Sequence, residues 1–235
     1  MAAKYPGLGP YVYCADNPVK LVDPNGEEIG IFIDSDGNCI GNDGKDDNRR
    51  YVIKTTAKDY GGVSAANLSQ EEYNDTYDFI SKNSGKKEEF EKNDIAYRNS
   101  VEIENSLENL NAIKKIIFQD KGALFVGYNP SDNREYGGRN ENGTIVQDPA
   151  GNVSVPQRGA SMIIYRTENT IYTFHTHCSG WDGNFFYKQH ASQDDIDHAG
   201  STINYCFGMN DRTVYIYNKD GIQATLPIKA FFKNN

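Results

Sequence analysis

The stretch TIYTFHTH, residues 170–177, has the alternating pattern of a β-strand that buries one face. Successive side chains of a strand point to opposite faces, so His175 and His177 project from the same face, about 7 Å apart along the chain. Tyr172 and Phe174 point to the other face, where we expect the core. Two imidazoles on one face can bind a single zinc ion, and an isolated His-x-His pair can equally be a polar strand end.

Two carboxylates elsewhere in the sequence favour the metal interpretation. Ser192-Gln-Asp-Asp195 is typical of a capped helix start, with Ser192 as the N-cap and Asp195 in the first turn. Such a helix start is a rigid support from which Asp195 could be a third ligand, leaving the fourth position for water. Upstream, Glu135 precedes the paired glycines Gly137 and Gly138, where we expect a strand to pass close to another element.

All four histidines lie between residues 175 and 198. His190 and His198 are therefore alternatives to Asp195 as ligands, and His198, three residues after Asp195, shares its helical face. Cys178 places a thiol beside the proposed metal. The 14 residues between His177 and Ser192 include several aromatic side chains, which form either sheet packing or a wall or lid beside the site.

The sequence pattern of the rest of the chain predicts alternating strands and helices. We expect a β-hairpin or small meander over 29–53, a helix from Ser69 to Asn83, and a second helix from Val101 that Lys121-Gly122 ends. Strands follow over 123–128 and 134–155, with a turn at Asn142-Gly143, and a pair of strands joined at Glu168-Asn169 spans 160–177. A helix over 192–207 and a closing hairpin over 213–228 complete the chain. The fold class is α/β or α+β.

An acidic turn near the start of this series has the opening spacing of an EF-hand calcium loop, with Asp34, Asp36 and Asn38. Gly37 stands at loop position four instead of six, however, and Lys45 takes the place of the bidentate glutamate at position twelve. We therefore expect a polar turn without calcium.

Composition excludes several classes of protein. The 235 residues carry 24 basic and 33 acidic side chains, a net charge of −9, with a mean hydropathy of −0.70. A negative chain without a basic run is unsuited to bind nucleic acid or an anionic membrane. No apolar run reaches the length of about 20 residues that a membrane span needs. The four scattered cysteines form no disulfide framework or zinc ribbon.

The order E-x-x-G, H-x-H, S-x-x-D resembles that of the JAB/MPN (JAMM) metallopeptidases, which have a cytidine-deaminase-like α/β fold. REYGG at 134–138, HTH at 175–177 and SQDD at 192–195 are similar to the JAB-type domains that end RHS and other polymorphic-toxin proteins. The resemblance covers residues 100–235. It implies Zn2+ held by His175, His177 and Asp195, with Glu135 as general base and Ser192 as donor to the developing oxyanion.

The first residues resemble the end of the core of RHS-repeat proteins, the Tyr-Asp-repeat shells of bacteria. The matching positions are Tyr11, Tyr13, Asn17, Pro18, Asp23, Pro24 and Gly26. We therefore expect four segments: the end of an RHS core at 1–26, a β-hairpin or linker at 27–66, a helical segment at 67–99, and the JAB/MPN-like domain at 100–235. The first residues lack the basic and apolar regions of a signal peptide, and we expect the sequence to be cut from a longer chain.

These resemblances imply a zinc-dependent peptidase or isopeptidase, the toxin-like effector part of a bacterial RHS protein that is exported or displayed at the cell surface. Its partners would be a peptide or protein substrate, the RHS shell of the parent chain and an immunity protein. Two alternatives remain open: a metal-dependent nuclease toxin, and a JAB-like binding module without activity. Metal analysis separates the last from the other two.

Overall fold

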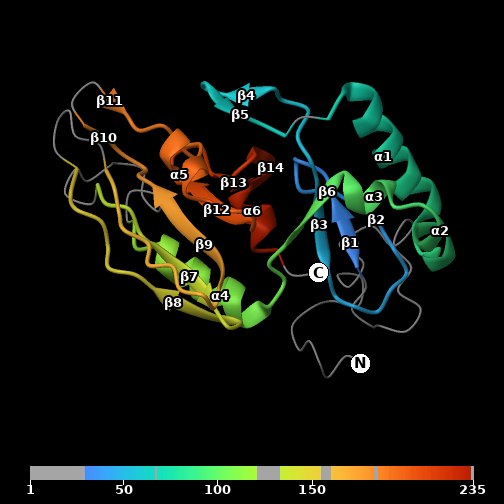
Figure 1. Ribbon diagram of the computed structural model, residues 1–235, viewed down its shortest axis with the longest axis horizontal. Helices are drawn as coiled ribbons and strands as arrows, with labels where there is room; N and C mark the ends of the chain where they lie inside the picture. Colours follow the sequence, from blue (N-terminus) through green and yellow to red (C-terminus); the bar gives the residue numbers. More distant parts are fainter. Residues whose placement is uncertain (1–29, 67, 121–132, 155–159, 183–184, 234–235) are drawn as a thin grey trace.

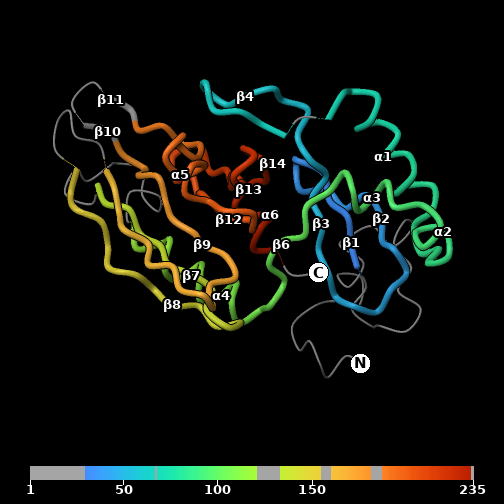
Figure 2. Tube along the Cα trace, in the orientation of Figure 1, coloured from blue at the N-terminus to red at the C-terminus, as the bar shows by residue number. Residues whose placement is uncertain are grey.

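Two β-sheets of four and six strands form the framework of the computed structural model, which describes residues 30–66, 68–120, 133–154, 160–182 and 185–233. Helices pack beside both sheets, and the tube in Figure 2 traces the chain from the four-stranded sheet through α4 into the six-stranded one (Figures 1 and 2). The fold is therefore mixed, of the α+β kind that the sequence predicts.

The four-stranded sheet has the strand order β2-β1-β3-β6. Its strands are β1 (Ile31–Ile33), β2 (Cys39–Asn42), β3 (Arg50–Ile53) and β6 (Ser100–Ile103). β1 and β2 form the expected antiparallel hairpin, but β3 runs parallel to β1 on its other side, so the three strands are not a meander. In the connecting turn, Asp34 Oδ1 accepts hydrogen bonds from the backbone N–H groups of Asp36 (3.0 Å) and Asn38 (2.8 Å). The polar turn is confirmed.

Helices α1 (Gln70–Asn83), α2 (Lys87–Lys92) and α3 (Ile95–Arg98) lie beside this sheet (Figure 1). The predicted start of α1 is confirmed by a capping box: Ser69 Oγ accepts from the N–H of Glu72 (3.1 Å), and Glu72 Oε2 accepts from the N–H of Ser69 (2.8 Å). Phe32, Ile80 and Phe90 belong to the core cluster that joins these helices to the sheet.

The six-stranded sheet has the order β14-β13-β12-β9-β7-β8. Its strands are β7 (Gly137–Glu141), β8 (Thr144–Gln147), β9 (Thr170–His177), β12 (Asn204–Gly208), β13 (Thr213–Asn218) and β14 (Gly221–Pro227). β9 and β12 are parallel and the other neighbours are antiparallel. Two predicted hairpins are confirmed, β7–β8 and β13–β14. The first turns at Asn142-Gly143, where both residues have positive φ.

The two faces of this sheet have different coverings. Tyr172, Phe174 and Tyr205 point into the large core cluster that also contains residues of α4 (Leu107–Ile117), α6 (Ile228–Phe231) and the four-stranded sheet. The opposite face packs against α5 (Gln193–Asp197) and the small hairpin of β4 (Asp59–Tyr60) and β5 (Val63–Ser64). The histidines of β9 lie on this second face.

Two predicted helices are shorter than expected. Val101 and Ile103 belong to β6, so the second helix is only α4, which begins after the N-cap Ser106 and ends at Ile117. The helix predicted over 192–207 is only α5, because Asn204–Gly208 form β12 between β9 and β13. In each case a distant strand supplies backbone partners that local periodicity does not reveal.

Of the two strands predicted over 160–177, only the second forms, as β9. Residues 160–167 have no strand ladder, and the N–H of Tyr165 donates to the side chain of Asp148 instead. The strand predicted at 123–128 and the RHS-like segment at 1–26 lie outside the described residues. In the described part of the chain, no helix has both the length and the apolar character needed to cross a bilayer. The domain boundaries stay predictions.

Arg50 joins the four-stranded sheet to the end of the chain. Its side chain is buried and donates hydrogen bonds to the carbonyls of Phe231 (2.9 Å), Ala230 (3.0 Å) and Glu104 (3.3 Å). Burial lowers the pKa of Arg50 to about 10, so the guanidinium is still charged at neutral pH. One cation therefore satisfies carbonyls of α6 and of the β6–α4 connection.

Replacing Arg50 by Met, which has similar length and no donors, is expected to lower the free energy of unfolding by about 2–3 kcal/mol, because buried carbonyls lose a charged donor. Arg98, in an exposed ion pair with Asp94 on α3, is the control: Arg98→Met is expected to change stability by less than about 0.5 kcal/mol. Urea unfolding followed by circular dichroism measures both. Equal effects of the two substitutions would contradict a joining role for Arg50.

Candidate metal centre

Strand β9 places two buried imidazoles side by side. His175 and His177 are 3% and 8% exposed, and their Nε2 atoms are 3.2 Å apart. Nδ1 of His177 lies 2.8 Å from the carbonyl oxygen of Lys188. A carbonyl only accepts, so Nδ1 carries the proton, and Nε2 is left to act as a ligand in the neutral ring. The alternative of a polar strand end in solvent does not describe these residues, because both are buried.

Helix α5 brings Asp195 to the same point. Its Oδ1 is 3.3 Å from His175 Nε2, and its Oδ2 is 3.5 Å from His177 Nε2. Asp195 is held by a capping box: the N–H (2.6 Å) and hydroxyl (2.7 Å) of Ser192 both donate to Oδ2. The structure therefore brings the three predicted ligands together.

The charges of this cluster are strongly coupled. Burial by itself would lower the pKa of His175, but the carboxylate of Asp195 outweighs it and raises that pKa well above its usual range. Burial opposes ionisation of Asp195, yet the two histidines hold the pKa of its carboxyl far below the usual range. The cluster thus favours positive charge at its centre, carried by protons on the imidazoles or by a cation that replaces them.

The spacing of the donor atoms fits a tetrahedral metal. For bonds of about 2.0–2.2 Å, the edges of a tetrahedron of nitrogen and oxygen ligands measure about 3.3–3.6 Å. The two histidine nitrogens are 3.2 Å apart, and each lies at such a distance from a different oxygen of Asp195, His175 Nε2 at 3.3 Å from Oδ1 and His177 Nε2 at 3.5 Å from Oδ2. Two imidazoles with a carboxylate are also a common donor set for zinc. The residues present therefore fit the ion that the sequence predicts.

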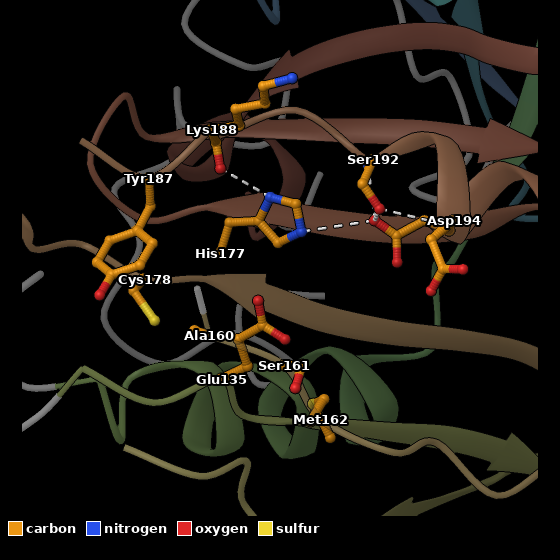
Figure 3. A pocket seen from close by; sticks show the side chains of 11 residues that line it. Glu135, Ala160, Ser161, Met162, His177, Cys178, Tyr187, Lys188, Ser192 and Asp194 are labelled. Carbon is orange, nitrogen blue, oxygen red and sulfur yellow. Dashed lines mark hydrogen bonds and ion pairs between the residues drawn. The ribbon is translucent and has the colours of Figure 1, made fainter. Parts of the chain in front are cut away.

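Glu135 lies across a pocket from this cluster. The pocket has a volume of about 240 Å³ and is lined by Glu135, His177, Ser192 and Asp195 among others. Figure 3 shows the Glu135 carboxyl directed into it toward His177. Burial raises the pKa of Glu135, although the neighbouring histidines partly oppose this. Four of the five predicted site residues thus line one pocket, and the fifth, His175, has its Nε2 3.2 Å from that of His177.

Paired glycines let the strand that follows Glu135 run close to its neighbours β9 and β8. Gly137 pairs with His175 between β7 and β9, and a Cβ on Gly137 would lie 2.2 Å from the carbonyl oxygen of Phe174. A Cβ on Gly138 would lie 2.1 Å from the carbonyl oxygen of Val146 in β8. The expected close approach is confirmed, since only glycine fits between these two neighbours.

The other two histidines lie apart from the cluster. His198 ends α5 with an exposed side chain whose Nδ1 donates to the carbonyl of Asp194 (2.8 Å). His190 donates from Nδ1 to the carbonyl of Ala191, and its ring packs on Tyr215. Neither has the position of a ligand with His175 and His177.

Two cysteines lie near the site, and sequence reasoning noticed only Cys178. Cys178 lines the pocket, where burial and the carboxylates of Glu135 and Asp120 raise the pKa of its thiol. Cys206, in contrast, forms a buried group with His175 and His177 whose ligand atoms all lie within 4.8 Å of one another, a group that could hold a metal ion. Cys206 was missed because its place depends on the pairing of β12 with β9.

The loop predicted as a wall or lid forms a small hairpin of β10 (Trp181–Asp182) and β11 (Phe185–Phe186). The side chains of Trp181, Phe185 and Phe186 are outside the described part of the structure, whereas Tyr187 lines the pocket (Figure 3). The function of this loop stays a prediction.

Comparison with protein-family models, with curated proteins and with solved structures finds no match to this chain. The case for a function therefore rests on the geometry of the site and on the sequence motifs.

Proposed function

We propose that this chain is a zinc-dependent peptidase or isopeptidase of the JAB/MPN type, the effector part of a bacterial RHS protein. The observation that carries the proposal is the convergence of His175, His177 and Asp195 on one point, with Glu135 across the pocket. This is the arrangement that hydrolysis of an amide needs: a metal site, a nearby base and space for a substrate.

A zinc ion bound by these ligands would polarise the substrate carbonyl and lower the pKa of water. Glu135 would take a proton from the attacking water and pass it to the leaving amine. Its raised pKa suits both steps, because a group that first takes and then returns a proton works best when its pKa is near the operating pH.

Ser192 would donate a hydrogen bond to the oxyanion. Its single hydroxyl proton points to Asp195 Oδ2, 2.7 Å away. A cation that takes up the negative charge of Asp195 weakens that acceptor, so the hydroxyl can turn toward the pocket that it already lines. Cation binding and oxyanion stabilisation are thus coupled through one carboxylate.

The wider setting of the proposal comes from the sequence motifs. The RHS-like pattern at 1–26 supports export or surface display of a bacterial parent protein, with the RHS shell and an immunity protein as partners. The nuclease alternative is less favoured. The net charge is −9, and three carboxylates, those of Glu135, Asp194 and Asp195, line the pocket together with one lysine, Lys188. Such a surface repels a phosphate backbone.

The direct test is metal-dependent hydrolysis. The protein is stripped with a chelator, then incubated with a mixed peptide library and with isopeptide-linked substrates, with and without one equivalent of zinc. We expect new amine termini, detected by mass spectrometry, only with zinc. Zinc binding without cleavage of any peptide or isopeptide would refute the hydrolase and leave a metal-holding binding module.

A further inference from the structure

Strand pairing places a thiol beside the candidate metal centre. In the parallel pair β9–β12, Cys206 lies opposite His175. Its side chain belongs to the cluster on the α5 face of the sheet, the face that carries the two histidines, and it is fully buried. Sγ and one ring nitrogen of each histidine lie within 4.8 Å of one another.

The thiol interacts with both histidines, and it donates a hydrogen bond to the carbonyl of Gln189 at 3.5 Å. A thiol is a weak donor, so this bond to a backbone carbonyl holds Sγ only weakly. In a tetrahedral zinc site the separation between sulfur and nitrogen ligands is about 3.5–3.6 Å. Sγ lies within 4.8 Å of a ring nitrogen of each histidine, so each of these distances exceeds that separation by about 1.3 Å at most.

Cys178 is the contrasting case. It is also buried and close to His177 in sequence, but it lies on the pocket side with Glu135 and near Asp120. Among the described residues, the group of mutually close ligand atoms around the two histidines contains Cys206 and not Cys178. Cys178, the thiol next to His177 in the sequence, is therefore not the one that could share a metal with the two histidines.

We propose that Cys206 is a fourth protein ligand of the metal, together with His175, His177 and Asp195. This rests on the proposed function only in that both require a metal at this point. A thiolate among the ligands selects zinc or another thiophilic divalent ion over magnesium, calcium or manganese. It also closes the buried side of the site, so that only the side lined by Glu135, His177 and Asp195 is open to substrate.

A ligand set of this kind restrains catalysis. Closed sites with four protein ligands are typical of structural zinc, and catalytic zinc keeps an open position or expands to five ligands. With Cys206 bound, the centre is a resting state that reacts only by expansion toward Glu135. The chain would thus hold its metal tightly and react slowly until substrate fills the pocket.

Cobalt absorption tests the assignment without any enzyme assay, because sulfur ligation gives Co2+ an intense near-ultraviolet charge-transfer band that nitrogen and oxygen ligands do not give. Reduced, metal-free protein is titrated with Co2+ under anaerobic conditions. We expect one equivalent to produce the band in the natural sequence and in a variant with Cys14→Ser, Cys39→Ser and Cys178→Ala, where Cys206 is the only thiol. Cys206→Ser should bind Co2+ without the band, and its zinc affinity should fall by more than about 100-fold, beyond the loss seen when only an outer partner of a ligand is replaced.

The variant that retains only Cys206 keeps the test decisive even if Cys206→Ser fails to fold. One bound equivalent of Co2+ without the band in the natural sequence would overturn the assignment of Cys206 and leave the hydrolase intact. A band that persists in Cys206→Ser, or is lost when only Cys206 remains, would overturn it as well. Failure to bind any Co2+ or zinc would overturn both this inference and the proposed function.

Discussion

Glu135→Gln is expected to lower the rate of zinc-dependent amide hydrolysis by a factor of about 100 to 10,000, the usual contribution of a general acid–base group. Gln has the shape of Glu but cannot take a proton from water. The pocket keeps its volume, and the ligand atoms of His175, His177 and Asp195 are unchanged, so one equivalent of zinc should still bind. Hydrolysis rates and zinc content measured on the same sample separate the two effects.

Glu168 supplies the control. It lies in the exposed turn before β9, and Glu168→Gln removes the same charge from the chain without touching the pocket. Its rate is expected to equal that of the natural sequence. A Glu135→Gln variant with full activity would show that another group is the base, and loss of zinc from it would show that Glu135 acts on the metal site instead.

His177→Ala is expected to abolish stoichiometric zinc binding. Its Nε2 is one of the proposed ligand atoms, its tautomer is set by the carbonyl of Lys188, and its side chain lines the pocket. Removing the ring leaves the site without one of its three proposed ligands. In the natural sequence, zinc at 100 times its Kd should add about 2.7 kcal/mol to the free energy of unfolding, and in the variant this increment should vanish.

His198→Ala is the matched control, because this exposed histidine caps α5 three residues after Asp195. It should keep one zinc per chain and the full increment in stability. Zinc analysis after dialysis, with thermal unfolding in the presence and absence of zinc, gives both numbers. One tightly bound zinc in His177→Ala would exclude the proposed centre, whatever the effect on folding.

These two substitutions probe different parts of one arrangement. His177 is part of the cluster in which positive charge is favoured, and Glu135 lies on the opposite wall of the pocket. If the centre is catalytic, each variant should lose hydrolysis, but only His177→Ala should lose the metal. That separation distinguishes a hydrolase from a chain that holds metal for stability alone.

Much of the site was predictable because its parts are local. The alternation of residues 170–177 and the capped helix start at Ser192 can each be recognised within a few residues. The same holds for the capping box at Ser69 and the turn at Asn142-Gly143. Such patterns act through neighbouring backbone groups, so the sequence carries them directly.

Other predictions were wrong where a distant partner decides. Val101 and Ile103 have helical spacing with the residues after them, yet they form β6 because β3 pairs with them. Residues 204–208 continue a helical pattern from Ser192, yet they form β12 between β9 and β13. A strand makes its hydrogen bonds with residues far along the chain, and the local spacing of apolar residues does not identify those partners.

The sequence by itself therefore determined the α+β class, the strand with its two histidines, and the carboxylates that accompany them. Only the tertiary structure decided that these histidines are buried, that His190 and His198 lie elsewhere, and that Cys206 is the thiol beside the centre. The reason is physical: motifs specify which donors a chain offers, whereas the register of β9 with β12 and the docking of α5 on the sheet set which donors meet.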